Sequence, residues 1–186
     1  MKTWMKVALC ASLLAPATAV RADKKTDTVE TASGKRTTTE GEIGDRAFTE
    51  RAAASNLAQV KLGQLALEKA ESPTVKQLGQ RMIDDHTKAN QELKSLADKE
   101  SLPMATEPDA RSKATYDKLA KLSGQSFDKA YLKAMAKEHD DAVELYKHEI
   151  ATAGIDPVVK AWAQKTLQTV EERGRLVHQD RDALKK

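Results

Sequence analysis

Apolar side chains recur at intervals of three and four residues along nearly the whole chain after residue 44. Ala, Leu, Lys, Glu and Gln dominate this region, and β-branched or aromatic residues never alternate over the length of a strand. This spacing places apolar side chains on one face of an α-helix, and the dominant residues are strong helix formers. The pattern therefore predicts an all-α domain.

Capping residues, prolines and glycines divide this region into helices. Ser72-Pro73 and Asp156-Pro157 each place a capping residue before a proline, which suits the first position of a helix. Asp45 is a candidate cap for the first helix, and Ser126 for the third long helix. We expect four long helices and one short helix, over about 45–71, 73–101, 108–122 (short), 126–154 and from 157 toward the C-terminus.

The lengths of the connections predict how these helices are arranged. The first two long helices, and likewise the last two, are joined by turns so short that each pair forms an antiparallel hairpin. The segment 102–125 contains the short helix and is long enough to travel the length of a bundle. This predicts a four-helix bundle with a ferritin-like crossover between the second and third long helices; the alternative is up-down-up-down packing with a flap.

Residues 1–22 have the features of a secretory signal. A basic start precedes an apolar stretch over 7–14, and small residues precede the expected cleavage points after Ala19 or Ala22. The alternative is a retained membrane anchor, but the apolar stretch is shorter than the roughly 20 residues that cross a bilayer. No later segment is free of charge for that length, so we expect an exported protein of the periplasm or cell envelope without a transmembrane helix in its mature part.

Charge argues against nucleic-acid binding. Residues 1–22 hold three of the 31 basic residues and no acidic residue, so 28 basic and 28 acidic residues remain in the mature chain. A formally neutral chain lacks the basic surface that attracts nucleic acid. The single cysteine, Cys10, lies within the signal, so we expect neither a disulfide nor a thiolate metal site in the mature protein.

Residues 23–44 differ in composition from the helical region. They are rich in Thr, Lys, Glu and Gly and almost lack large apolar side chains. Such a segment buries too little surface to offset its conformational entropy. We therefore expect a disordered tether over 23–44, followed by the helical bundle over 45–186.

Four polar residues interrupt the apolar faces of the four long helices: Gln59, His86, His139 and Arg173. Each falls near the middle of its own predicted helix, so all four are expected in one layer of the bundle whichever way the helices run. Neutral imidazoles are common ligands of Fe, Zn and Cu. His86 and His139 therefore form a candidate site for iron or another divalent metal.

The alternative is a polar network in which Gln59 and Arg173 hydrogen-bond the imidazoles and fix the register of the helices. A di-iron bundle needs a Glu three residues before His on two helices, whereas the positions before His86 and His139 are Ile83 and Ala136. A guanidinium also repels a cation nearby. No nucleophile motif, phosphate loop or zinc-protease helix occurs in the mature chain, so an enzyme is not favoured.

Several sequence motifs together resemble one bacterial family, over about 48–176. The motifs are Gln59-Val60-Lys61-Leu62-Gly63-Gln64-Leu65-Ala66, Val75-Lys76, Met82-Ile83-Asp84-Asp85-His86, Phe127-Asp128-Lys129-Ala130-Tyr131 leading to His139, and Asp156-Pro157. They resemble the family catalogued as domain of unknown function 4142. The resemblance implies an exported, ferritin-like helical bundle without an established activity. Family members tend to carry Glu at the position of Gln59 and His near Arg173, so two ligand-like positions differ here.

Three hypotheses about function follow. The first is a non-enzymatic bundle of the cell envelope that serves in stress protection or binds a small ligand or partner. The second is a metal-dependent oxidase or metal store that uses His86 and His139. The third is an interaction module held near the membrane by residues 23–44. The sequence assigns no partner and no oligomeric state.

Overall fold

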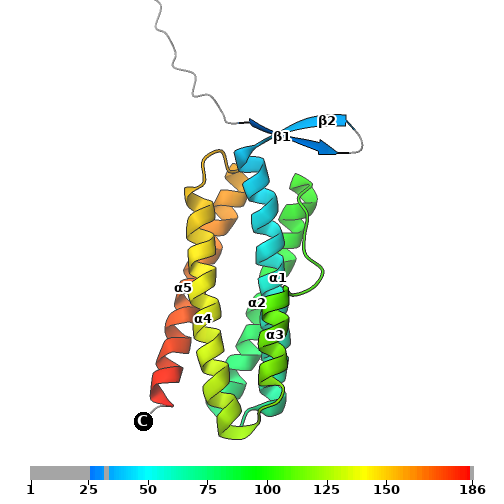
Figure 1. Ribbon diagram of the computed structural model, residues 1–186. Helices are drawn as coiled ribbons and strands as arrows, with labels where there is room; N and C mark the ends of the chain where they lie inside the picture. The colour runs from blue at the N-terminus through cyan, green and yellow to red at the C-terminus, as the bar shows by residue number, and fades with distance from the viewer. Residues whose placement is uncertain (1–25, 32–33, 185–186) are drawn as a thin grey trace, which may run out of the picture.

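The computed structural model describes residues 26–31 and 34–184, so the predicted signal over 1–22 lies outside the described part (Figure 1). The described residues contain four long helices and one short helix, as the sequence predicts. Their bounds are α1 (Glu40–Lys69), α2 (Pro73–Glu100), α3 (Ala110–Leu119), α4 (Gly124–Ala151) and α5 (Pro157–Ala183). Among these residues, no helix combines the length and the apolar composition needed to cross a membrane.

The connection between α2 and α4 is the predicted long crossover (Figure 1). After α2 ends, the chain runs back along the bundle through a loop and α3, and α4 then begins at the end where α2 begins. Helices α2 and α4 are therefore parallel, whereas α1 and α5 run opposite to them. This is the ferritin-like order of a four-helix bundle, and the up-down-up-down alternative is wrong.

One carboxylate of α4 holds the turn between α1 and α2. Asp128 accepts hydrogen bonds from the backbone N–H groups of Glu71 (3.2 Å) and Ser72 (2.8 Å). Ser72 occupies the N-cap position of α2 but makes no side-chain capping bond. Asp128 thus supplies from another helix the acceptor that a capping residue would supply locally. The N-cap of α4 is Ser123, three residues before the predicted Ser126.

A second carboxylate connects α1 to the turn between α4 and α5. Asp45 is not the cap of the first helix as predicted, because α1 begins five residues earlier, at Glu40. Its side chain is 4% exposed and accepts from the backbone N–H of Asp156 at 3.1 and 3.4 Å. Asp156 in turn caps α5 as predicted, accepting from the N–H groups of Val158 and Val159.

Part of the predicted tether has regular secondary structure. β1 (Thr26–Thr31) and β2 (Gly34–Thr39) pair as an antiparallel hairpin, with Thr26 opposite Thr39. The lack of large apolar side chains in this segment predicted disorder, but the segment is also rich in β-branched threonines, which favour extended backbone.

The core consists of two clusters of buried side chains, one toward each end of the bundle. The cluster near the α1–α2 turn contains Phe127 and Tyr131, whose rings stack with centroids 5.4 Å apart. The other cluster contains Phe48 and Tyr146, whose rings meet edge to face at 5.2 Å. On every long helix, the predicted polar residue falls between the residues that belong to the two clusters. A polar layer therefore separates two apolar halves of the core.

Helices α1 and α2 approach one another closely at a pair of glycines. A Cβ atom on Gly63 would lie 2.5 Å from the carbonyl oxygen of Gly79, and one on Gly79 would lie 2.8 Å from Cβ of Ala66. Real Cβ atoms essentially never come so close to other heavy atoms. The absence of a side chain at both positions is what lets these two backbones touch.

Candidate functional site

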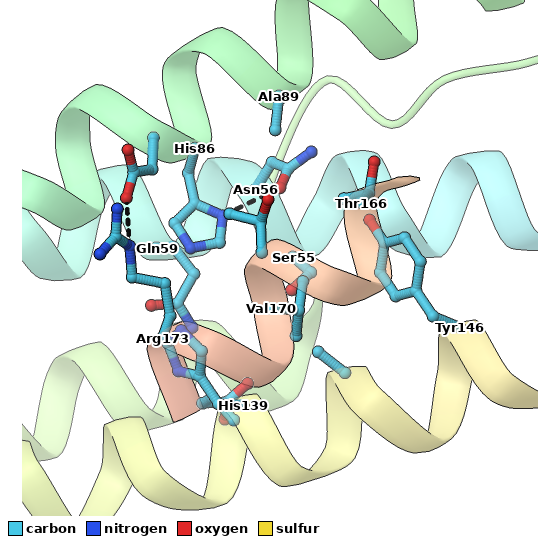
Figure 2. Close-up of a pocket in the computed structure, with 14 residues that line it drawn as sticks. Ser55, Asn56, Gln59, His86, Ala89, His139, Tyr146, Thr166, Val170 and Arg173 are labelled. Carbon is cyan, nitrogen blue, oxygen red and sulfur yellow. Dashed lines mark hydrogen bonds and ion pairs between the residues drawn. The ribbon is translucent and has the colours of Figure 1, made fainter. Parts of the chain in front are cut away.

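The structure brings all four predicted polar residues to one cavity at mid-height in the bundle (Figure 2). Gln59 comes from α1, His86 from α2, His139 from α4 and Arg173 from α5. Gln59 and His139 are each 2% exposed, whereas His86 and Arg173 are half-buried. The position of the polar residues along the four helices thus predicted the level of the bundle at which this cavity lies.

The cavity is small. It offers about 40 Å³ to the centre of a water-sized sphere. A water molecule needs roughly 10–15 Å³ by the same measure, so there is room for about three waters or for one ion and little else. The wall between the polar groups includes Ala89, Ala142 and Val170.

Asn56 on α1 fixes the orientation of the His86 ring. Nδ1 of His86 lies 3.0 Å from Oδ1 of Asn56, and the bond is drawn in Figure 2. Because an amide oxygen only accepts, Nδ1 carries the proton and donates it. The other ring nitrogen, Nε2, therefore keeps its lone pair and is free to act as a ligand.

A backbone carbonyl fixes the His139 ring in the same way. Nδ1 of His139 donates to the carbonyl oxygen of Met135, one turn earlier on α4, at 2.9 Å. Nε2 of His139 is buried and has no hydrogen-bond partner among the described residues, and the same holds for Oε1 of Gln59. Both imidazoles are thus anchored through Nδ1. Of the cavity's buried polar atoms, two acceptors (Nε2 of His139 and Oε1 of Gln59) and one donor (Nδ2 of Asn56) have no partner among the described residues.

The two rings enter the cavity from helices α2 and α4. Their centroids lie 6.1 Å apart and their planes are inclined by 71°. Figure 2 shows the two side chains reaching into the same space, with Gln59 and Arg173 beside them. One small species between the rings can therefore contact both.

Both imidazoles are neutral at neutral pH. Burial, followed by the neighbouring His139 and Arg173, lowers the pKa of His86 to about 3. Burial also lowers the pKa of His139, although its bond to the Met135 carbonyl opposes this. Protons therefore do not compete for the Nε2 lone pairs in the physiological range.

Arg173 does not hydrogen-bond the imidazoles, contrary to the predicted polar network. Its Nε donates to Oδ2 of Asp85, 2.5 Å away, on α2. Asp85 is adjacent to His86 in the sequence, and a neighbouring residue on a helix points about 100° away, so the spacing of the apolar residues does not place Asp85 in the layer. Arginine is long enough to reach it. Gln59 does not hydrogen-bond the imidazoles either. Asn56 is the partner of His86, and the carbonyl of Met135 is the partner of His139.

Asn56 is a site residue that was not expected from the sequence. Asn56 precedes Gln59 by three residues and so shares its helical face, a signal that was present in the sequence. Glu138 also lines the cavity; burial raises the pKa of its carboxyl group, while Arg111 opposes that change. The remaining histidines lie elsewhere: His148 is exposed, and His178 contacts Asp140 at 2.9 Å.

The set of possible ligands is short. Within the described residues, no three His, Cys, Asp or Glu side chains are grouped so that they could hold a metal ion together. Asp85 is paired with Arg173. Glu138 also lines the cavity but is not grouped with the two histidines in this way, and its carboxylate lies 4.0 Å from the guanidinium of Arg111. The acceptors best placed for a cation are therefore the two imidazole nitrogens and the neutral amide oxygen of Gln59.

Comparisons with known proteins agree with this fold. Residues 28–179 match the family described as domain of unknown function (DUF4142). The solved structures that resemble the chain include a DUF305 protein from Streptomyces coelicolor, provisionally described as secreted. Its TM-score is 0.60 at 18% identity, and the match covers 72% of this chain and 89% of that one. A DUF305 fragment from Deinococcus radiodurans gives 0.63 at 18% identity, covering 73% and 93%. None of the curated proteins matches the chain.

Proposed function

Since the chain belongs to the family described as domain of unknown function (DUF4142), we propose that it is an exported, non-enzymatic bundle of the cell envelope that binds one metal ion between His86 and His139. The ion would sit in the polar layer that separates the two apolar halves of the core. Binding there would join α2 to α4 across the bundle.

The observation that carries this proposal is the pair of anchored imidazoles. Each Nδ1–H is held by a carbonyl oxygen, of Asn56 in one case and of Met135 in the other. Metal-binding histidines are typically held in this way, because the outer bond fixes the tautomer and the direction of the ligating nitrogen. A network that served only to fix helix register would be expected to satisfy Nε2 of His139 and Oε1 of Gln59 as well.

The donor set supports binding rather than redox catalysis or iron storage. Ferritin-like di-iron sites use glutamates from all four helices, together with histidines. Here α1 carries Gln59 at the position where family members tend to carry Glu, and Asp85 forms an ion pair with Arg173. Two imidazoles and an amide are neutral ligands, and they do not supply the carboxylates that hold a pair of iron ions.

Export is supported by the sequence of residues 1–22, which has the features of a secretory signal. One structural neighbour is itself provisionally described as secreted. A location in the periplasm or at the cell envelope would follow from cleavage of this signal.

The test is metal binding by protein purified without an affinity tag. Elemental analysis and thermal unfolding, before and after chelation, would be compared for the wild type, His86→Ala and His139→Ala. We expect one ion per chain in the wild type, a lower unfolding temperature after chelation, and loss of both effects in the variants. His148→Ala is the matched control, because His148 is exposed and outside the cavity.

The more conservative His86→Gln and His139→Gln replace the alanine variants if those do not fold. Metal content that is equal in the wild type and in the folded variants would exclude this site. So would a wild-type protein that binds no ion when titrated.

A further inference from the structure

We infer that the ion held between His86 and His139 is a soft monovalent ion in near-linear two-coordination, with Cu(I) as the physiological species and Ag(I) as its redox-stable equivalent. This inference rests on the proposed function. It deepens that function by choosing among the classes of metal that imidazoles bind.

The separation of the two rings fits an ion held between nitrogens on opposite sides. An imidazole nitrogen binds a metal at about 2.0 Å and lies about 1.1 Å from its ring centroid, so each centroid would lie about 3.1 Å from the ion. Two rings on opposite sides of one ion then have centroids about 6.2 Å apart, and two rings at a tetrahedral angle about 5 Å apart. The observed separation of His86 and His139 is 6.1 Å.

Rotation of the rings does not affect this fit. A ring can turn about the bond between its nitrogen and the metal without changing the distance to the ion. The 71° between the two planes is therefore compatible with opposite nitrogens. A tetrahedral ion would require the rings to approach one another by about 1 Å, in a core closed by buried side chains on both sides.

The number of ligands in the cavity also favours an ion of low coordination number. Zinc in proteins takes four ligands, commonly from Cys, His, Asp and Glu. Asp85 and Glu138 line this cavity, but Asp85 is paired with Arg173, and no third His, Cys, Asp or Glu of the described residues is grouped with the two histidines to hold an ion. The cavity then supplies two imidazoles, one neutral amide oxygen and space for about three waters. A two-coordinate ion requires only the two imidazole nitrogens as ligands.

A positive charge lies beside the proposed ion. Arg173 lines the same cavity as His86 and His139, and Figure 2 shows its side chain next to the two rings. Its repulsion of a bound cation is proportional to the charge of that cation. A monovalent ion is repelled half as strongly as a divalent ion at the same position. Asp85, bonded to Arg173, offsets part of this repulsion for either ion.

The experiment compares affinities for monovalent and divalent ions in the full mature chain. Ag(I) is titrated as nitrate in chloride-free buffer, Cu(I) anaerobically against a chromophoric chelator, and Zn(II) and Cu(II) under matched conditions. We expect one Ag(I) or Cu(I) per chain, bound more tightly than either divalent ion. His86→Ala and His139→Ala should each weaken Ag(I) binding by about 100-fold or more, and His148→Ala should not. X-ray absorption of the Cu(I) form should show two nitrogen neighbours.

Removing the charge of Arg173 gives a second readout. Arg173→Gln should strengthen binding of Zn(II) by about tenfold and of Ag(I) by about threefold, because the repulsion it relieves is twice as large for the divalent ion. Arg175→Gln is the matched control, since Arg175 is exposed on the same helix. An equal gain for both ions would show that repulsion by Arg173 does not favour the monovalent ion.

The outcomes separate the two proposals. Tighter binding of Zn(II) or Cu(II) than of Ag(I), lost in the histidine variants, would overturn the monovalent assignment and leave metal binding in place. No histidine-dependent binding of any of these ions would overturn both. Three or four light-atom neighbours around Cu(I) would overturn the two-coordinate geometry.

Discussion

At the scale of single residues, Asn56 decides what His86 can do. Its Oδ1 accepts from Nδ1 of His86, and this bond sets the tautomer of the ring. The amide is 4% exposed, and its Nδ2 has no hydrogen-bond partner among the described residues. Burial of this unpaired Nδ2 group lowers the stability of the fold, and orientation of the imidazole is the role that accounts for an asparagine here.

Substitution of Asn56 tests this role. Asn56→Leu removes the acceptor and frees the His86 ring, so we expect the affinity for Ag(I) to fall by about 10-fold to 100-fold. Asn56→Asp restores an acceptor at the same place and should retain or exceed the affinity of the wild type. Titration with Ag(I) measures both, with circular dichroism as the check on folding. Equal affinities in Asn56→Leu and Asn56→Asp would show that the bond does not position the ring.

A second residue-scale feature is the buried carboxyl of Glu149. It is 3% exposed and hydrogen-bonded to Asp45, whose carboxylate also accepts from the backbone of Asp156. Burial, followed by the charge of Asp45 and this bond, raises the pKa of Glu149 to about 7. Because the folded protein binds this proton more tightly than the unfolded chain does, the bond stabilises the fold most below about pH 4.5. That stabilisation is lost as the pH rises toward 7.

Glu149→Gln should therefore change stability in a pH-dependent way. Glutamine keeps a donor toward Asp45 and has no proton to lose, so the free energy of unfolding of the variant, relative to the wild type, should rise between pH 5 and pH 8. We expect a rise on the order of 2 kcal/mol. Urea unfolding at both pH values measures it. Glu144→Gln, at an exposed position of α4, is the control. A difference that is independent of pH would contradict a raised pKa at Glu149.

At the scale of elements, the contact between α1 and α2 depends on Gly63 and Gly79. Gly63→Ala would place a methyl group 2.5 Å from the carbonyl oxygen of Gly79, and a backbone atom cannot move aside as a side-chain end can. We expect a loss of about 2 kcal/mol or more in the free energy of unfolding, although alanine is the better helix former. Denaturant unfolding measures this. Gln64→Ala, at the next and exposed position, should be close to neutral, and a neutral Gly63→Ala would show that the helices can separate without cost.

The elements themselves were predictable because their signals are local. Spacing of apolar residues and the pairs Ser72-Pro73 and Asp156-Pro157 located the helices, and the length of 102–125 favoured the crossover that the structure has. The start of α1 was placed five residues too late, because Asp is a common N-cap residue and Asp45 was therefore predicted as the cap. Its real partner, the backbone of Asp156, is 111 residues away and leaves no local signal.

The candidate site was predictable in position and not in its bonding. Periodicity placed Gln59, His86, His139 and Arg173 in one layer, since each interrupts an apolar face near mid-helix. Periodicity does not predict the hydrogen-bond partner of each side chain, because a long side chain can reach either of two neighbouring helices. Arg173 therefore pairs with Asp85 instead of an imidazole, and the carbonyl that holds His139 belongs to a backbone that periodicity does not describe.

At the scale of the whole molecule, the polar layer divides the core into two apolar clusters. A layer with unpaired acceptors contributes less to stability than either cluster, because buried polar groups without partners are costly. An ion bound to His86 and His139 would satisfy two of these acceptors and connect helices α2 and α4 on opposite hairpins. Ligand binding at this layer should therefore strengthen the bundle as a whole.

The expected size of this effect follows from linkage. An ion at 100 times its dissociation constant stabilises the folded state by about 2.7 kcal/mol, which in a domain of this size raises the melting temperature by roughly 5 to 10 °C. Thermal unfolding followed by circular dichroism, with and without Ag(I), measures the shift in the wild type, His139→Ala and His148→Ala. The shift should vanish in His139→Ala and persist in His148→Ala, since His139 lines the cavity and His148 does not. A shift of equal size in all three proteins would place the ion on the surface, where it would join no helices.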